Sequence, residues 1–163
     1  MKNFRNKGAI GALLDEYEKA VLELNEVLDK VTTVELLTVV DAATKDPDCH
    51  SIQTILNHVV RSGYGYMTMI RNHLGEQNER VKCESFEQVE TYQQVLLEMF
   101  AYNDKFLEDY PDVKLEQLEM DKKILVSWGQ HYDIEQLLEH AIVHILRHRR
   151  QIERFLEKLR EES

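Results

Sequence analysis

Three histidines stand four residues apart near the end of the sequence, in the run HAIVHILRHRRQI: His140, His144 and His148. Residues at positions i and i+4 of an α-helix lie on the same face, one turn apart. Two imidazoles in this arrangement can bind one divalent metal ion through a nitrogen of each ring. The spacing therefore indicates a metal site, provided that the segment is helical and that other parts of the chain supply further ligands.

The apolar pattern around these histidines predicts which of them face the core. An apolar stripe recurs at steps of three and four residues through Ile134, Leu138, Ala141, Ile145, His148, Ile152, Phe155 and Leu159. At about 100° per residue, His148 lies within this stripe, His144 lies roughly 40° to one side, and His140 lies roughly another 40° out. We therefore expect His144 and His148 to point inward and His140 to lie at the boundary. A single buried histidine is usually satisfied by hydrogen bonds, whereas two adjacent ones are explained equally well by a shared metal.

A third ligand has to come from another part of the chain. His58 is the best candidate, although the helical pattern places it at the edge of an apolar arc and does not turn it decisively inward. His73 lies nearer its apolar arc but close to a predicted helix end, while His50 and His131 fall in predicted loops. The sequence contains no Glu-x-x-His pair and no HExxH motif, which excludes the ferritin-like di-iron and zinc-protease classes. A mononuclear, histidine-rich site remains.

Four long amphipathic helices are predicted to position these residues. Apolar residues at steps of three and four place them over residues 10–31, 52–74, 85–106 and 134 to the C-terminal end, with a short helix over 34–40. Ser51 and Asp133 are the expected N-caps of the second and fourth long helices, and Gly75 ends the second. Ser85 with Gln88 forms the expected capping box of the third.

The whole chain, residues 1–163, has the length of one domain, and we predict an all-α four-helix bundle. The connections before the second and the fourth long helix each have about 20 residues or more, and about 20 extended residues reach beyond about 60 Å. Both connections can therefore return along a helix of about 35 Å. Two such crossovers favour the up-up-down-down order over simple alternation.

The composition excludes several classes of function. A net charge of −10 argues against a nucleic-acid-binding surface, which needs clustered lysines and arginines. No apolar stretch approaches the roughly 20 residues that a membrane span requires. The first residues show no apolar leader, and Cys49 and Cys83 are isolated, so we expect a cytoplasmic protein that acts on a small molecule.

Two segments together resemble the DinB/YfiT-like family of four-helix-bundle metalloenzymes. The first is SIQTILNHVVRSGYGY on the second predicted long helix, and the second is HAIVHILRHRRQI on the last. The resemblance implies that His58, His144 and His148 hold a divalent ion, zinc or nickel, with water in the open positions, and that the protein forms a homodimer. The chain departs from the family pattern at Arg150, where the family often has glycine, which leaves the ligands unchanged but alters the local surface.

Two functions from different classes follow from this resemblance. The first is a metal-dependent transferase that uses a low-molecular-weight thiol, such as bacillithiol, at the three-histidine site, with His140, Gln151 or Asn103 orienting the ligands. The same site could instead activate water for hydrolysis. The second is a non-catalytic, stress-related binding or dimerisation bundle whose metal site is structural or vestigial. Asn103 is also open to a structural interpretation, because a lone polar residue in an apolar stripe commonly fixes helix register.

Overall fold

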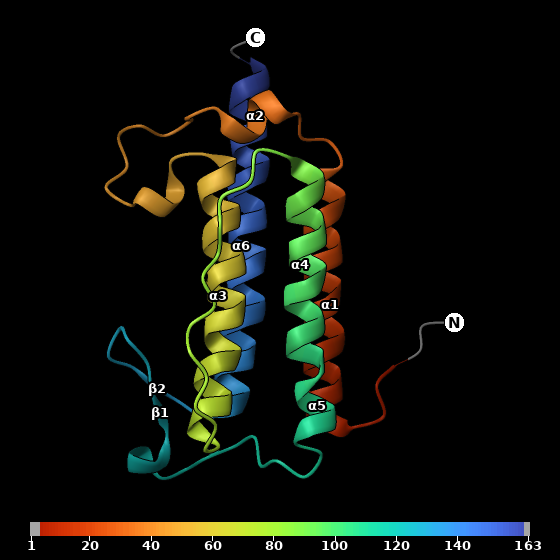
Figure 1. The fold of residues 1–163 in the computed structure, drawn as a ribbon, viewed down its shortest axis with the longest axis vertical. Coiled ribbons are helices and arrows are strands. Elements are labelled where there is room, and N and C mark those ends of the chain that lie inside the picture. Colours follow the sequence, from red (N-terminus) through yellow and green to blue (C-terminus); the bar gives the residue numbers. More distant parts are fainter. Residues whose placement is uncertain (1–3, 162–163) are drawn as a thin grey trace.

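Four long helices make up most of the protein. The computed structural model describes residues 4–161. The long helices are α1 (Gly8–Leu28), α3 (Ile52–His73), α4 (Val89–Asp104) and α6 (Ile134–Glu161) (Figure 1). Between them lie the short helices α2 (Thr33–Leu37) and α5 (Phe106–Asp109), the 3-10 turns η1 (Pro47–Cys49) and η2 (Met120–Lys122), and a hairpin of β1 (Ile124–Leu125) with β2 (His131–Tyr132). The predicted all-α class is confirmed. None of the described helices combines the length and the apolar character that crossing a membrane requires.

Two of the predicted N-caps form as expected. The Ser51 hydroxyl accepts a hydrogen bond from the Thr54 amide over 3.2 Å, and the Asp133 carboxylate accepts one from the Gln136 amide over 2.9 Å. These bonds satisfy amides at the start of α3 and α6 that have no partner within the helix. Gly75 follows α3 with a φ of +102°, a left-handed conformation that glycine adopts without strain.

The predicted start of the third long helix is wrong. α4 begins at Val89, four residues after the expected cap at Ser85. The Ser85 hydroxyl accepts a hydrogen bond from the side-chain amide of Asn57 over 2.8 Å, and so contacts α3 instead of capping a helix. The Ser85 hydroxyl, which the local sequence pattern predicts to cap a helix, therefore forms a tertiary hydrogen bond instead.

Hydrogen bonds between the long helices fix their directions. Arg149 of α6 bonds to Glu23 of α1, and Arg160 near the end of α6 donates to the carbonyl of Lys30, just after α1, over 2.7 Å. α1 and α6 therefore run parallel. α3 and α4 run in the opposite direction, so that the order is up-down-down-up (Figure 1). α1 and α3 each pack against both α4 and α6.

The predicted up-up-down-down order with two crossovers is wrong. The connection over residues 74–88 runs the length of the bundle, whereas the two longer connections each stay at one end (Figure 1). Roughly 15 extended residues span about 50 Å, which exceeds the length of about 33 Å of the 22-residue α3. The shortest connection is therefore long enough to cross, and the longer ones are free to fold into α2, η1 and the β-hairpin.

The connection between α1 and α3 folds back over the start of α3. The amide of Val40 donates to the carbonyl of His50 over 2.8 Å, which closes the loop. Within it, the Asp46 carboxylate caps η1 by accepting a hydrogen bond from the Asp48 amide over 3.0 Å. These bonds hold residues 46–50 beside the first turns of α3.

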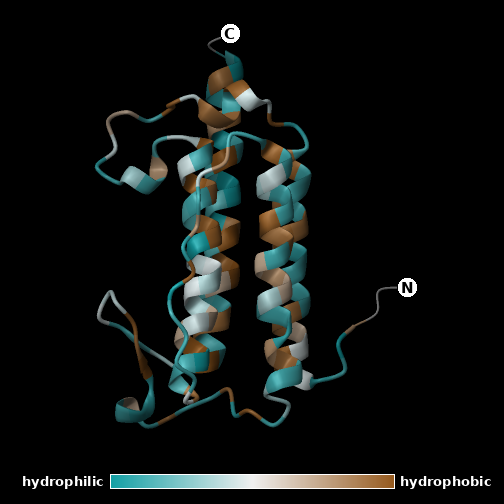
Figure 2. Ribbon diagram, in the orientation of Figure 1, coloured by the Kyte–Doolittle hydropathy of each residue, from teal (hydrophilic) through white to brown (hydrophobic). Residues whose placement is uncertain are grey.

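The core lies between the four long helices, where their apolar stripes meet. Figure 2 shows hydrophobic and hydrophilic residues alternating along each of these helices, as amphipathic helices require. The largest fully buried side chains include Tyr17, Leu24, Leu56, Tyr92 and Phe106. The apolar stripe of α6 is buried as predicted from Ile134 to Ile152, and His148 occupies one position in it with 1 % of its surface exposed.

Candidate metal centre

The structure brings His58 of α3 together with His144 and His148 of α6. One ring nitrogen of each residue lies within 4.8 Å of the other two. Nε2 of His58 and Nε2 of His144 are 2.8 Å apart, and the centre of the His148 ring lies 4.5 Å from that of His144 and 5.0 Å from that of His58. Because α3 and α6 pack antiparallel, one histidine of α3 meets two of α6 that are a turn apart. Among residues 4–161 this is the one group of three or more histidine, cysteine, aspartate or glutamate side chains placed to bind a metal.

Hydrogen bonds to the other ring nitrogens set the tautomers of two of these histidines. Nδ1 of His58 lies 3.0 Å from the Asp48 carboxylate, and Nδ1 of His148 lies 3.0 Å from the amide oxygen of Gln151. Both oxygens accept hydrogen bonds, so we assign the proton to Nδ1 and the lone pair to Nε2 in both rings. One guanidinium nitrogen of Arg61 also lies 3.2 Å from Nδ1 of His58, but this Arg61 nitrogen donates its hydrogen bond to the Asp48 carboxylate, over 2.5 Å.

These tautomers leave a cluster of lone pairs that hydrogen bonds do not satisfy. Nε2 of His148 is buried and has no hydrogen-bond partner among the described residues. Nε2 of His58 and Nε2 of His144 can share one proton, which leaves His148 unpaired. A divalent cation accepts all three lone pairs at once, and carboxylate and amide oxygens on the opposite nitrogens are the usual supports of metal-binding histidines. The residues present therefore fit a metal that prefers imidazole ligands.

Burial keeps the cluster neutral at physiological pH. It lowers the pKa of His144 to about 2 and that of His148 to about 4, and the neighbouring histidines act in the same direction. Burial also lowers the pKa of His58, against the raising effect of the Asp48 carboxylate. Neutral imidazole is the form that binds a metal, so all three rings are in their ligand form at pH 7.

Two of the residues predicted to support the ligands lie at the cluster. Gln151 contacts His148 through the hydrogen bond described above. His140 is half-buried, at the predicted boundary; its ring stacks on Trp128 with 5.3 Å between centres and lies 6.3 Å from the ring of His144. The predicted division of the triplet into two buried histidines and one boundary histidine matches these positions.

Asn103 belongs to a different interface. Its side-chain amide donates to the carbonyl of Met99 over 2.7 Å and to that of Gly63 over 3.5 Å. These bonds place Asn103 between α4 and α3, whereas the histidines lie between α3 and α6. They fit the structural interpretation, in which a buried polar residue fixes the contact between two helices.

Asp48 is a contact of the cluster that the sequence pattern does not indicate. It lies in the polar loop KDPDCH, ten residues before His58, and no helical spacing relates the two. The sequence does indicate a turn in this loop, because Asp46 and Pro47 favour a tight turn shortly before the Ser51 N-cap. Such a turn directs the loop back toward α3, but it does not specify which side chain reaches the histidine.

A pocket of about 410 Å³ opens beside the cluster. His58 and His144 form one part of its wall, and Tyr66, Trp128 and His140 form an aromatic part. The rings of Tyr66 and His140 pack edge to face, with 5.3 Å between their centres. Concave sites with apolar walls and a few converging polar groups are typical of small-molecule binding.

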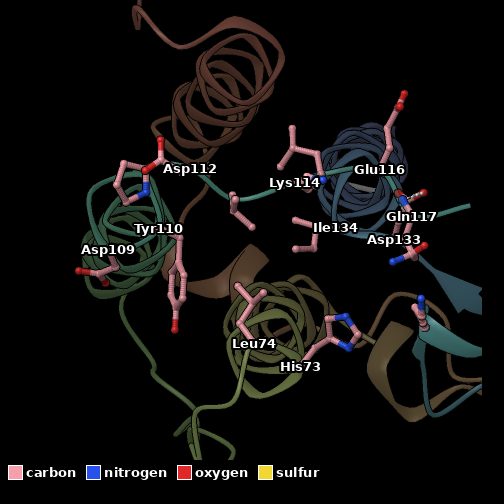
Figure 3. Close-up of a pocket in the computed structure, with 14 residues that line it drawn as sticks. His73, Leu74, Asp109, Tyr110, Asp112, Lys114, Glu116, Gln117, Asp133 and Ile134 are labelled. Atoms are coloured by element: carbon pink, nitrogen blue, oxygen red, sulfur yellow. Dashed lines mark hydrogen bonds between the residues drawn. The ribbon is translucent and has the colours of Figure 1, made fainter.

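A larger pocket, of about 510 Å³, contains none of the three histidines. Figure 3 shows it between Leu74 at the end of α3, Tyr110 after α5 and Ile134 at the start of α6. His73, the alternative third ligand, lines this pocket and is therefore not part of the cluster. Volume alone does not identify the functional site, because this larger pocket lacks a comparable group of ligands.

Comparison with known proteins agrees with these observations. A sequence model of the DinB family matches residues 7–159, which include α1, α3 and α4 and all but the last two residues of α6. No curated protein matches the chain significantly. Both segments that carry the histidine cluster lie within the matched residues, and the chain belongs to the DinB family.

Proposed function

We propose that the protein is a metal-dependent transferase that joins a low-molecular-weight thiol, of the bacillithiol type, to an electrophilic small molecule. In this proposal His58, His144 and His148 hold one divalent ion, zinc or nickel. The observation that carries the proposal is the convergence of three neutral nitrogens, one of them buried without a partner, beside an open pocket. A metal site that faces a pocket supports catalysis, since the coordination of structural sites is closed by protein ligands.

The residues around the cluster are suited to thiol chemistry. When bound, a divalent ion with three neutral ligands keeps its positive charge and lowers the pKa of a nearby thiol, so that the thiolate forms at neutral pH. Asp48 and Gln151 hold two of the histidine rings in their ligand orientation. Trp128 and His140, stacked on each other, offer a flat wall against which an apolar electrophile can lie.

The lining of the pocket disfavours a hydrolase of the HExxH type and is compatible with a thiol nucleophile. Among the described residues that line it, none is an aspartate or glutamate. Hydrolases of the HExxH type use such a carboxylate to take the proton of water, whereas a thiol beside a cation loses its proton without that base. In the transfer, the sulfur forms a bond to the electrophilic carbon, the leaving group departs with its bonding electrons, and the thiol proton goes to solvent. A three-histidine site can also activate water without a carboxylate, and the assay of halide release described below distinguishes the two reactions.

Metal analysis of protein purified without a histidine tag tests the site. We expect a stoichiometric content of zinc or nickel that is lost in His144→Ala and in His148→Ala, while His140→Ala retains most of it. Absence of metal, together with a melting temperature that a chelator does not change, would overturn the proposal. Equal loss in all three variants would overturn the roles assigned to the triplet.

Turnover is measured as conjugation of a thiol to a chromogenic aryl halide. Bacillithiol, glutathione and cysteine are compared with the metal-loaded protein. We expect halide release that requires both metal and thiol and that is absent in His144→Ala. Halide release without any thiol would indicate hydrolysis instead. Metal-loaded protein that is inactive with all three thiols and has no exchangeable water on the metal would favour a structural site.

A further inference from the structure

Four arginines of the protein have no carboxylate partner within residues 4–161. The chain has nine arginines and a net charge of −10. Five of the arginines form ion pairs with aspartate or glutamate: Arg5, Arg61, Arg71, Arg149 and Arg160. The four without such a pair in the described part of the chain are Arg80, Arg147, Arg150 and Arg154. All four are exposed to solvent, which leaves their guanidinium groups accessible to a ligand.

All four of these arginines line two neighbouring hollows at the histidine cluster. The pocket of about 410 Å³ that His58 and His144 line also contains Arg80 and Arg147. A second hollow, of about 490 Å³, is lined by Cys49, Arg147, Arg150, Gln151 and Arg154. Arg147 belongs to both hollows, and Gln151 connects the second hollow to His148 by its hydrogen bond.

Neither hollow has an aspartate or glutamate among its described lining residues. The Asp48 carboxylate lies close by, but it is already bonded to Arg61 and His58. By contrast, the pocket at the end of the bundle is lined by Asp109, Asp112, Glu116 and Asp133 beside two lysines (Figure 3). Among the described arginines, those without a carboxylate partner are therefore concentrated at the histidine cluster.

The spacing of three of these arginines suits the binding of an anion. Arg147, Arg150 and Arg154 stand at positions i, i+3 and i+7 of α6, so that they lie along one face of the helix. Like charges at such spacing repel one another unless an anion lies between them. A guanidinium group offers a planar pair of donors that matches a carboxylate or a phosphate. At about 1.5 Å per residue, the three arginines cover about 10 Å, the size of a small molecule.

We propose that Arg147, Arg150 and Arg154, here called the arginine patch, bind the acidic end of a small molecule that carries at least two carboxylate or phosphate groups. The other end of this molecule reaches the histidine cluster through the pocket that Arg147 shares. The inference rests on the proposed function in one respect, because the bound anion is the thiol or the electrophile of that reaction. A nucleic acid is disfavoured, since the patch is short and the chain around it carries a large negative net charge.

Binding is measured on metal-free protein with two readouts. The first is the fluorescence of Trp128, the single tryptophan of the chain, which lines the pocket. The second is the shift in melting temperature. The probes are succinate and inorganic pyrophosphate, with propionate as the singly charged control and all solutions at equal ionic strength. We expect saturable binding of at least one of the two probes, about tenfold or more tighter than that of propionate.

Variants of α6 separate the patch from the general charge of the helix. Arg147→Gln and the double variant Arg150→Gln/Arg154→Gln should each weaken binding about tenfold, whereas Arg149→Gln, on the same helix but paired with Glu23, should leave it within about twofold. The double variant Arg150→Lys/Arg154→Lys keeps the charge and the fold, and should lie between these values because it loses the paired donors.

Each outcome has a defined meaning. Tighter binding of succinate assigns carboxylate as the acidic group, and tighter binding of pyrophosphate assigns phosphate; both support the patch. No saturable binding to the wild-type protein, or equal weakening in Arg149→Gln, overturns it, as does a short single-stranded oligonucleotide that binds more tightly than both probes. Because metal-free protein is used, anion binding without metal binding would overturn the proposed function alone, and metal binding without anion binding would overturn this inference alone.

Discussion

Replacing Asp48 by asparagine tests whether the loop before α3 controls the affinity of the histidine cluster for metal. The Asp48 carboxylate lies 3.0 Å from Nδ1 of His58 and holds the proton on that nitrogen, so that Nε2 faces the other two histidines. Asparagine keeps an oxygen at this place but removes its negative charge. The ring of His58 then loses part of its basicity and of its fixed orientation, which weakens it as a ligand.

The expected loss follows from the strength of this hydrogen bond. A bond to a charged group contributes about 1.5–3 kcal/mol and one between neutral groups about 0.5–1.5 kcal/mol. The difference of roughly 1–1.5 kcal/mol corresponds to metal binding about tenfold weaker. Replacing a residue that supports a metal-binding histidine typically lowers metal affinity about 10- to 100-fold. The side chains of His58 and Asp48 are 25 % and 29 % exposed, and screening by solvent keeps the loss expected for Asp48→Asn at the lower end of this range. Asp48→Ala, which removes the acceptor, should approach the upper end.

Zinc affinity is measured by competition with a chromogenic chelator at pH 7 and constant ionic strength. Asp46→Asn is the matched control, because it removes an equal charge from the same loop, and asparagine caps a turn about as well as aspartate. The Asp46 carboxylate bonds to the amide of Asp48 and the thiol of Cys49, and not to a histidine. We expect Asp46→Asn to change the affinity by less than about twofold. Wild-type affinity in Asp48→Asn, or equal losses in both variants, would refute the reasoning.

Three further predictions concern stability. In metal-free protein, the folded-state pKa values of His144 (about 2) and His148 (about 4) lie below the unfolded value of about 6.5. The two histidines therefore contribute their full stability above pH 6.5, and this contribution falls at lower pH because the unfolded chain takes up protons that the folded chain does not. The free energy of unfolding in urea should be roughly 2–4 kcal/mol lower at pH 5 than at pH 7, and the double variant His144→Leu/His148→Leu should reduce this difference. Gly63→Ala should cost about 1–3 kcal/mol in the same assay, because its Cβ would overlap the buried sulfur of Met99. Arg71→Gln should lower the stability in the same assay, because it removes the ion pairs of the buried Arg71 guanidinium with Glu76 and Asp109, while zinc affinity stays unchanged, since these residues do not contact the cluster.

The features that follow from local rules are the ones that could be predicted from the sequence. The apolar period of α6 predicts the burial of His144 and His148, because side-chain direction along a helix depends only on residue number. The caps at Ser51 and Asp133 follow from bonds that span three residues. The helical pattern alone did not show whether His58 points into the core, because its place in the cluster depends on how α3 packs against α6.

The features that depend on distant contacts could not be predicted in this way. A connection of roughly 15 residues can either turn back at once or cross a helix, because its reach of about 50 Å permits both. Ser85 has the residue type of a cap but is bonded to Asn57 of α3. Asn103 fits its apolar stripe in any bundle, and only the packing of α4 against α3 shows that its bonds go to Gly63 and Met99.

The wrong helix order left the predicted ligands unaffected, and the reason lies in the relative direction of two helices. α3 and α6 are antiparallel both in the predicted up-up-down-down order and in the observed up-down-down-up order, so either order brings an early residue of α3 beside the middle of α6. The orders differ in what they require of the connection from α1 to α3. In the predicted order this connection would have to extend along the whole bundle. In the observed order it stays at one end of the bundle, so it has length to spare and its residues are free to form α2, η1 and the turn at Asp46. That spare length allows Asp48 to reach His58, so the topology determines how the ligand is oriented even though it does not determine which residues are the ligands.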